Sequence, residues 1–515
     1  MKAGLLFIVI LSCANIVCAQ TITFTIDRKK TAQTIENIGA SGAWFSEGIG
    51  KYWPESTKQK MAELLFSKAF NAKGNPTGIG LSAFRFNIGG GTAEQRDSSG
   101  ISSAVKRVEC FLSPDGKYDW RKQSGYLFFA RQAAKYGVEN LIAFSNTPPV
   151  QFTKNGLGFK TKKDYETNLR DDKYAAYADF LAIVIEHFDK ENLHFNYISP
   201  VNEPQWDWSN DWGKMNQEGS PWHNEDIYRI TKALDSAFIA KKLSSQIIVT
   251  EAGILTALYE GNGHASKQIQ HFYSGDSSLY IGNLSHVKKV IEGHSYFTDF
   301  GDSNIVSVRT KLRDTCAKYN VSFWQSEYSM LGDGYKEGKT GKIPAIDCAL
   351  FLAKMIYNDF TIANATAWHL WNSWEPGSAD SDTRYYLLAL QNNKENTEGD
   401  FSITKNLWAL GQYSRFIRPG MKRVIVQRND KMTEIEAEQN IMLSAYTNNK
   451  QVVVVAINYT TKNKTINLDG LGKTEGTTQY ITTGDKEENM TPYKVSAISK
   501  CSLPARSIST FVISI

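Results

Sequence analysis

The stretch I-S-P-V-N-E-P-Q-W-D-W, residues 198–208, joins a β-rich approach to a tryptophan-rich loop. Pro204 has no N–H group for a strand ladder, so we expect the strand to end at Glu203 and to present its carboxylate at the sheet edge. Indole rings stack on the apolar faces of sugar rings, the Asn202 amide can bond a hydroxyl, and a glutamate can transfer a proton. The stretch therefore indicates a carbohydrate site, although an isolated Glu-Pro pair is more commonly a surface turn.

Around this stretch, short apolar strands alternate with amphipathic segments of helical length. The eight predicted strands are residues 35–40, 82–88, 140–145, 195–203, 246–251, 289–296, 321–327 and 365–371. Apolar residues at helical spacing in segments such as 174–188 and 305–319 predict the helices between them. Eight strand–helix repeats over about 380 residues predict an α/β fold, a (β/α)8 TIM barrel whose site lies at the C-terminal ends of the strands. A doubly wound sheet is the alternative, but no G-x-G-x-x-G or Walker pattern follows any strand.

The pattern changes after the R-P-G sequence at residues 418–420. Residues 421–515 contain short β-branched or alternating runs separated by polar turns, which predict an antiparallel β-sandwich. The alternating segment 21–27 has no helix after it, so we expect residues 20–32 to join this sandwich. The predicted organisation is a signal at 1–19, the N-terminal strand at 20–32, the catalytic barrel at 33–420 and the side domain at 421–515.

The first residues are typical of an export signal. Lys2 supplies the positive charge, residues 4–11 form an apolar run too short to span a bilayer, and Val17-Cys18-Ala19 is a small-residue cleavage site. A lipoprotein signal acylated at Cys13 is the alternative. We therefore expect a periplasmic, secreted or cell-surface protein, and no later segment is apolar enough for a transmembrane span.

Composition excludes several other classes of protein. The chain has 515 residues, a formal net charge of +5 and no basic run, which argues against nucleic acid as a partner. The wide spacing of Cys110, Cys316, Cys348 and Cys501 does not fit a zinc ribbon or a redox pair, and we expect buried free thiols. We expect neither a metal ion nor an organic cofactor, and the sequence leaves the oligomeric state open.

A second glutamate changes the interpretation of the first. Glu327 closes V-S-F-W-Q-S-E-Y, residues 321–328, at the end of the seventh predicted strand, as Glu203 closes the fourth. Strands four and seven face each other across a barrel mouth, so the two carboxylates can flank one bond. A retaining glycosidase needs two such carboxyl groups about 5 Å apart, one as nucleophile and one as acid/base.

With this pair, the chain resembles glycoside hydrolase family 30, a member of the clan of (β/α)8 retaining glycosidases. The resemblance rests on N-E-P at 202–204 and on four further stretches: I-G-A-S-G-A-W-F at 38–45, R-F-N-I-G-G-G at 85–91, W-H-L-W-N at 368–372 and L-G-Q-Y-S-R-F-I-R-P-G at 410–420. It covers the whole mature chain, including the side domain. Within the family, the chain looks most like the endo-β-1,6-galactanase branch, which implies an oligo- or polysaccharide substrate.

The resemblance implies a role for several residues. Glu203 would protonate the leaving oxygen and later activate water, and Glu327 would attack the anomeric carbon. Asn202 would hold the sugar 2-hydroxyl, and Arg85 would bond Glu327 and keep it ionised. Arg85 can equally be a barrel-stabilising ion pair.

Further substrate contacts are expected around this pair. In G-H-S-Y, His294 and Tyr296 look like active-site groups, with Tyr296 orienting the nucleophile, although His294 can also be a satisfied core histidine. Trp44 lies in one of the matching stretches, and Trp371 resembles the indole under the attacked sugar. The loop tryptophans, with Trp206 foremost and Trp208, Trp212 and Trp222 beside it, are expected at flanking sugar subsites or in the packing of the loop. Strand parity predicts that Trp324 faces the helices and that Trp371, not Trp368, faces inward.

The sequence departs from the family pattern at strand three. Relatives often have a tryptophan there, whereas this chain has F-S-N-T-P-P at 144–149, which makes Asn146 a hydroxyl ligand instead. No arginine motif for a glucuronic acid branch is present. A β-1,6-glucanase, a xylanase or an exo-β-glycosidase could use the same catalytic pair, and a non-catalytic glycan-binding protein is the alternative from another class.

Overall fold

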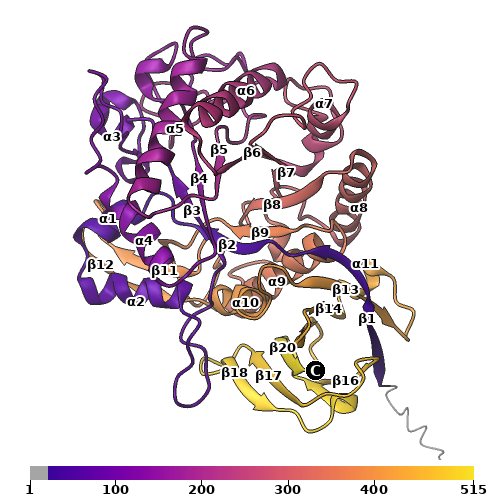
Figure 1. Ribbon diagram of the computed structural model, residues 1–515. Coiled ribbons are helices and arrows are strands. Elements are labelled where there is room, and N and C mark those ends of the chain that lie inside the picture. The colour runs from indigo at the N-terminus through magenta and orange to yellow at the C-terminus, as the bar shows by residue number, and fades with distance from the viewer. Residues whose placement is uncertain (1–20) are drawn as a thin grey trace, which may run out of the picture.

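The computed structural model describes residues 21–515, so the predicted signal and Cys13 lie outside the described residues. Eight parallel strands close a barrel in chain order (Figure 1). They are β2 (Asn37–Ser41), β3 (Ala83–Asn87), β4 (Asn140–Phe144), β5 (Tyr197–Ser199), β6 (Gln246–Ala252), β7 (Val287–His294), β8 (Ser322–Tyr328) and β9 (Ala367–Leu370). The predicted (β/α)8 barrel is confirmed, with β5 and β8 as its fourth and seventh strands.

Helices surround the barrel because each carries an apolar stripe that packs on the strands. On α5 (Tyr174–Lys190), which contains the predicted helical segment 174–188, apolar residues at helical spacing such as Tyr177, Leu181 and Phe188 are fully buried. The longer helices are α1 (Ser46–Tyr52), α2 (Glu55–Phe66), α4 (Ser124–Lys135), α5 (Tyr174–Lys190), α6 (Asn224–Lys241), α7 (Gln268–Tyr273), α8 (Asp302–Tyr319), α9 (Ala345–Thr361) and α10 (Lys405–Ser414). Two single-turn helices, α3 (Thr92–Gln95) and α11 (Glu434–Ala437), and a small sheet of β10 (Trp374–Pro376), β11 (Leu388–Asn392) and β12 (Gly399–Ile403) complete this part.

The side domain is one sheet of nine strands in the order β18-β17-β20-β15-β14-β13-β1-β16-β19. Its strands are β1 (Ile22–Thr34), β13 (Lys422–Arg428), β14 (Ile441–Thr447), β15 (Gln451–Asn458), β16 (Lys464–Asp469), β17 (Gly476–Thr482), β18 (Asn489–Lys494), β19 (Cys501–Leu503) and β20 (Ser507–Ser514). It encloses a core of its own, including Phe24, Leu443, Val454 and Phe511. The N-terminal strand joins this sheet as expected, but β1 runs parallel to β16, so the domain is not purely antiparallel.

The fourth barrel strand is shorter than predicted. It ends at Ser199 and not at Glu203, because Pro200 follows directly and has no N–H for the ladder. Glu203 therefore lies beyond the strand, where its backbone N–H donates to the Glu251 carbonyl at 2.8 Å.

Trp324 lies inside the barrel, which corrects the prediction that it faces the helices. Its ring contacts Tyr197 across the lumen at 5.0 Å between centroids, and it packs with Ala83, Ile142 and Val290 from other strands. The inward and outward alternation of side chains along β8 is broken because its pairing with β9 shifts between Gln325 and Tyr328. Trp324 and Glu327, which are three residues apart, can therefore face the same side.

A cluster of charged residues joins the barrel to the side domain. Lys354 of α9 is fully buried and pairs with Asp302 at 2.5 Å and Glu337 at 3.0 Å, and Glu438 lies 3.8 Å away. The Tyr459 hydroxyl, at the end of β15, donates to Glu337 at 2.9 Å. These contacts fix the side domain against α8 and α9.

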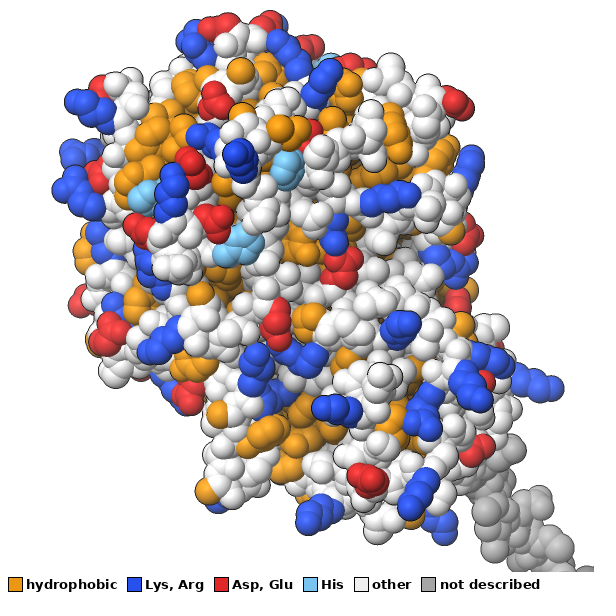
Figure 2. All heavy atoms as spheres, viewed as in Figure 1, with side chains coloured by type: hydrophobic (Ala, Val, Ile, Leu, Met, Phe, Trp, Pro, Cys, Tyr) orange, Lys and Arg blue, Asp and Glu red, His pale blue; other side chains and the backbone are white. Residues whose placement is uncertain are grey.

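The described surface fits the composition. Figure 2 shows Lys and Arg side chains scattered over one face among uncharged groups, without a continuous basic band. Cys110, Cys316, Cys348 and Cys501 are buried free thiols, as predicted. Among residues 21–515, no helix combines the length and the apolar composition needed to cross a membrane.

Candidate active site

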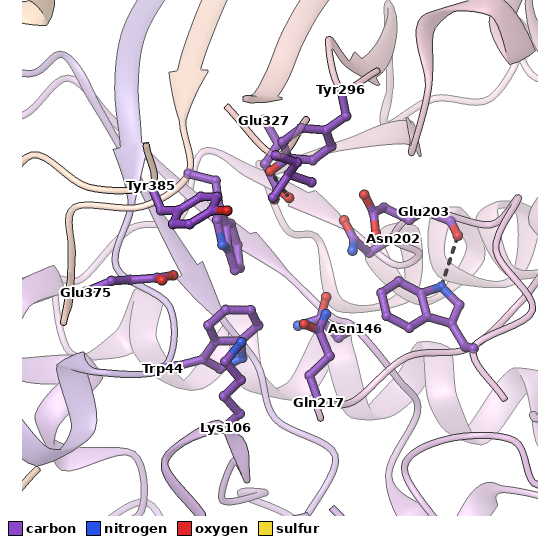
Figure 3. Close-up of a pocket in the computed structure, with 13 residues that line it drawn as sticks. Trp44, Lys106, Asn146, Asn202, Glu203, Gln217, Tyr296, Glu327, Glu375 and Tyr385 are labelled. Carbon is purple, nitrogen blue, oxygen red and sulfur yellow. Dashed lines mark hydrogen bonds between the residues drawn. The ribbon is translucent and has the colours of Figure 1, made fainter. Parts of the chain in front are cut away.

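A cavity opens at the C-terminal ends of the barrel strands (Figure 3). Asn146 follows β4, Glu203 follows β5, Tyr296 follows β7, Glu327 lies within β8 and Trp371 follows β9. The complete lining is Trp44, Lys106, Asn146, Asn202, Glu203, Trp208, Gln217, Tyr296, Glu327, Leu331, Trp371, Glu375 and Tyr385. The position is the usual one for the active site of a TIM barrel.

Glu203 and Glu327 meet at this cavity from opposite sides of the barrel. One oxygen of each carboxylate and one nitrogen of His294 all lie within 4.8 Å of one another. Both carboxylates are buried, with 8% and 5% of each residue exposed, yet both line the cavity. Two carboxyl groups at about 5–5.5 Å suit a double displacement at one sugar carbon, and this pair approaches that spacing.

Glu327 is held by two neighbours. Arg85, fully buried on β3, donates from Nη1 to Glu327 Oε2 at 2.7 Å, and the Tyr296 hydroxyl donates to Oε1 at 3.0 Å. Burial raises the pKa of Glu327, while the positive charges of His294 and Arg85 oppose that rise. The carboxylate is thus fixed in orientation by two donors, with Arg85 below the cavity and not part of its wall.

His294 connects the two glutamates from below the cavity. Its Nδ1 lies 3.0 Å from Glu203 Oε1 and 3.6 Å from Glu327 Oε1, and its Nε2 lies 3.0 Å from Glu251 Oε2. Burial disfavours the charged ring, but the three carboxylates prevail and raise the pKa of His294 to about 10. The imidazolium donates on both sides, so neither nitrogen is free to ligate a metal, and the cluster of Glu203, His294 and Glu327 fits proton chemistry better than a metal site.

Glu251 is an active-site support that the sequence analysis did not single out. It lies near the end of β6, accepts from Arg85 Nη2 at 2.8 Å and from Ser326 Oγ at 2.5 Å, and also faces His294. Burial opposes ionisation, but Arg85 and His294 lower the pKa of Glu251 to about 2. The signal was available, because T-E-A places a third glutamate at the end of a barrel strand, as at Glu203 and Glu327.

Four residues with left-handed backbone lie at the same place. Trp44, Glu203, Trp208 and Glu251 all adopt the left-handed region, with φ between 45° and 62°. Such conformations in residues other than glycine persist where the surrounding structure fixes them, and they cluster at functional sites. The strained backbone turns Glu203 toward the cavity after the early end of β5.

Several polar atoms of the cavity wall are buried without a hydrogen-bond partner among residues 21–515. They are Trp44 Nε1, Asn146 Nδ2 and Asn202 Oδ1. Unpaired buried donors and acceptors are costly unless a ligand or water completes them. Two donors and an acceptor around one cavity are suited to sugar hydroxyls, which both donate and accept.

Two indoles form part of the cavity wall. Trp44 and Trp371 meet edge to face, with ring centroids 4.8 Å apart and planes at 79°. Trp371 faces inward as predicted, while Trp368 donates to Asp359 of α9 and lies on the helix side. Trp206 lies outside the lining and packs near Gly253 and Phe297.

The other loop tryptophans divide between the cavity and the surrounding structure. Trp208 lines the cavity and donates from Nε1 to the Glu203 carbonyl at 3.0 Å. Trp222 is buried against Tyr177, and Trp212 is 61% exposed beside Gly100. Trp208 therefore lies where a sugar contact was expected of Trp206.

Comparison with known proteins places this site in a family. A sequence model of O-glycosyl hydrolase family 30 matches residues 21–385. The chain belongs to this family. The glucuronoxylanase XynC of Bacillus subtilis (strain 168) is 22% identical to this family 30 chain over 417 residues, 78% of this chain and 79% of the relative.

Two solved structures resemble this family 30 chain along most of its length. One is the crystal structure of a conserved exported protein from Bacteroides fragilis, which is 34% identical in sequence and has a TM-score of 0.88. The match covers 95% of this chain and 100% of that protein's chain. The catalytic domain of the GH30 xylanase C from Talaromyces cellulolyticus is 20% identical, with a TM-score of 0.67 over 96% of this chain and 100% of that domain. The protein is thus a glycoside hydrolase with the barrel and β-sheet domain of its family.

Five residues of the family 30 cavity were not predicted from the sequence: Lys106, Gln217, Leu331, Glu375 and Tyr385. All of them come from loops or from the small sheet, not from the eight barrel strands. No sequence pattern joins the 106 region to the 375 region. Only the fold brings them to one wall.

Proposed function

We propose that this family 30 enzyme is an exported, retaining endo-β-1,6-galactanase that cleaves galactan side chains of type II arabinogalactan. The observation that carries the retaining mechanism is the close approach of Glu203 and Glu327, whose carboxylate oxygens lie within 4.8 Å across the cavity. The galactan substrate is supported by the overall resemblance of the sequence to that branch.

In the first step, Glu327 attacks the anomeric carbon and forms a covalent glycosyl ester. Glu203 gives its proton to the glycosidic oxygen as the bond to the leaving sugar breaks. Arg85 and Tyr296 hold the attacking carboxylate in place through bonds of 2.7 and 3.0 Å. Asn202 holds the 2-hydroxyl, a contact that strengthens as oxocarbenium character develops.

In the second step, Glu203, now ionised, takes a proton from water, and the water oxygen attacks the same carbon. The ester bond to Glu327 breaks, and the sugar leaves with its original configuration. His294 keeps a positive charge beside both glutamates throughout, because its Nδ1 lies 3.0 and 3.6 Å from them. That charge compensates the carboxylate that is ionised at each stage.

One feature of the cavity and one of the sequence support a neutral hexose chain over glucuronoxylan. Asn146, with an unpaired Nδ2, stands where relatives often have a stacking tryptophan, so the wall there offers a hydroxyl ligand. The sequence also lacks the arginine motif for a glucuronic acid branch. Xylan remains the second candidate, because a curated relative is named a glucuronoxylanase.

A product profile tests the substrate. The purified enzyme is incubated with β-1,6-galactan, β-1,6-glucan and glucuronoxylan, and products are separated by size at early times. We expect β-1,6-galacto-oligosaccharides of several lengths from the start, which marks internal cleavage. Release of single galactose units alone would indicate exo action, and activity confined to xylan would overturn the galactanase proposal.

Export is supported by the signal-like residues 1–19 and by the exported description of the Bacteroides fragilis relative. Intact-mass measurement of the protein from its host tests it. We expect a chain that begins at Gln20. A chain that begins at an acylated Cys13 would show anchoring instead, and retention of Met1 would contradict export through this signal.

A further inference from the structure

One wall of the cavity carries two charged groups that the proposed mechanism does not use. Lys106 belongs to the 3-10 turn Ala104–Lys106 in the loop after β3, and Glu375 belongs to β10 beyond β9. Both are half-buried and line the cavity with Trp44 and Tyr385 (Figure 3). Two segments about 270 positions apart (375 − 106 = 269) thus meet at the substrate.

Within the part of the chain that the structure describes, neither charge has a close ion-pair partner, although the charge of Lys106 and the Asn372 side chain both favour the ionised form of Glu375. Among residues 21–515, Lys106 Nζ makes no hydrogen bond to a protein atom, and no oppositely charged group lies within 4.0 Å of either side chain. The ammonium instead lies 3.9 Å from the centroid of a Trp44 ring, a cation–π contact. Burial lowers the pKa of Lys106 and raises the pKa of Glu375 to about 7. A ligand that donates to the carboxylate and accepts from the ammonium would relieve both costs.

Their position assigns them to one side of the cleaved bond, provided that the proposed catalytic roles hold. Figure 3 shows Lys106, Glu375 and Tyr385 around Trp44, on the side of the cavity away from Glu203. Glu203 must reach the leaving oxygen, so the leaving sugar lies on its side. The opposite wall faces the sugar that becomes attached to Glu327.

We propose that Lys106 and Glu375 together bind adjacent free hydroxyls of that sugar and make the site selective for a neutral glycoside. The ammonium donates to one hydroxyl oxygen, and the carboxylate accepts from the neighbouring hydroxyl. A uronic acid at this position would meet Glu375 as a like charge, so the pair disfavours it even though Lys106 alone would attract it. A sugar linked through one of these hydroxyls would lose half of the contact.

The test compares four proteins on aryl β-glycosides with a good leaving group. The proteins are the wild type, Lys106→Met, Glu375→Gln and the control Lys122→Met, which removes a half-buried lysine outside this cavity. The substrates are 2,4-dinitrophenyl β-galactoside, its 3-deoxy and 4-deoxy analogues, the galacturonide, the glucoside and the xyloside. Thermal unfolding of each variant checks that it folds.

We expect each cavity variant to lose about 10- to 100-fold in kcat/KM on the galactoside, since each loses a charge-assisted hydrogen bond. For the wild type, kcat/KM should be much lower on one of the deoxy analogues than on the galactoside. For the variant that lacks the partner of the missing hydroxyl, kcat/KM on that analogue should be little lower than its kcat/KM on the galactoside. In Glu375→Gln, the ratio of kcat/KM for the galactoside to kcat/KM for the galacturonide should be at least about tenfold lower than in the wild type. Lys122→Met should behave as the wild type.

The proposal is overturned if both cavity variants keep kcat/KM within twofold of the wild type. It is also overturned if the variants fold but lose the same factor on the deoxy analogues as on the galactoside, because the pair then acts without touching those hydroxyls. If the wild type prefers the glucoside or xyloside, the galactanase proposal fails, and the deoxy analogues of the preferred sugar test the pair in the same way.

Discussion

The protein buries charge in two places with different surroundings. Beneath the cavity, Arg85 and His294 face Glu251, Glu327 and Glu203, and two of those carboxylates reach the cavity wall. At the domain junction, Lys354 faces Asp302, Glu337 and Glu438, and none of these lines a described cavity. In the first cluster, Glu203 and Glu251 have left-handed backbone. Of the acids around Lys354, only Glu337 has left-handed backbone.

This contrast separates charge used for chemistry from charge used for assembly. A buried ion pair by itself is weak support for function, because structural networks also perturb pKa values. What distinguishes the cavity cluster is that two of its carboxylates are open to a ligand, since left-handed backbone at Glu337 and an oxygen of Glu438 that is unpaired among residues 21–515 occur at the junction as well. Substitutions that change only activity or only stability can test whether the two clusters differ in this way.

We expect the largest loss of activity from substitution of Glu327. Glu327→Gln removes the proposed nucleophile while keeping the shape, so activity should fall below detection on every substrate, including activated aryl glycosides. Hydrolysis is followed by release of the aryl group, and carbohydrate binding is followed by calorimetry. A variant that still turns over activated substrates would reject Glu327 as nucleophile, and a wild type that binds galactan but hydrolyses nothing would support a glycan-binding protein.

The effect of Glu203→Gln should depend on the leaving group. On natural polysaccharide the loss should be about 10²- to 10⁴-fold, because the leaving oxygen is no longer protonated. On 2,4-dinitrophenyl glycosides the first step should survive, and added azide should restore turnover by replacing the activated water. A Brønsted plot of kcat/KM against leaving-group pKa measures this, and equal loss across all leaving groups would count against the acid/base role.

The junction cluster should respond in stability and not in activity. Lys354→Met leaves buried carboxylates without their cation, so the free energy of unfolding should fall by about 3–5 kcal/mol. Values of kcat/KM at a temperature where the variant is folded should stay within about twofold of the wild type. Denaturant unfolding and kinetics on one sample test both parts. Loss of activity in the folded variant would erase the contrast between the clusters.

The last expected effect, which leaves activity aside, is a pH dependence of stability that comes from His294. Its pKa is about 10 in the folded protein against 6.5 when unperturbed, so the folded state binds the proton more tightly. The stabilisation is complete below about pH 6.5 and is lost as the pH rises toward 10. The melting temperature of the wild type should therefore fall more steeply between pH 7 and 10 than that of His294→Gln. Parallel curves would show that His294 is neutral in the folded protein.

The barrel and its two glutamates could be predicted because their signals are local. Each lies near the end of an apolar strand, and strand order alone places β5 opposite β8. The errors arose where backbone irregularities broke simple rules. Pro200 ended β5 early, and the register shift in β8 turned Trp324 into the lumen.

The remaining site residues could not be found by reading along the chain. Lys106 and Glu375 become neighbours only through loops whose paths depend on tertiary packing. Trp206 and Trp208 are two residues apart in one loop, and only Trp208, whose backbone is left-handed, lines the cavity. Glu251 is an exception, since its place at a strand end marks it in the same way as the catalytic pair.

The first strand has a consequence for biosynthesis. β1 pairs with β13 and β16, so Phe24 lies beside Arg428 and Leu468 in the finished sheet. During synthesis this segment leaves the ribosome early, but its partners exist only when the chain is nearly complete. We therefore expect the side domain to close last, and truncation at either end to expose a strand edge in the middle of the sheet that can pair with another chain.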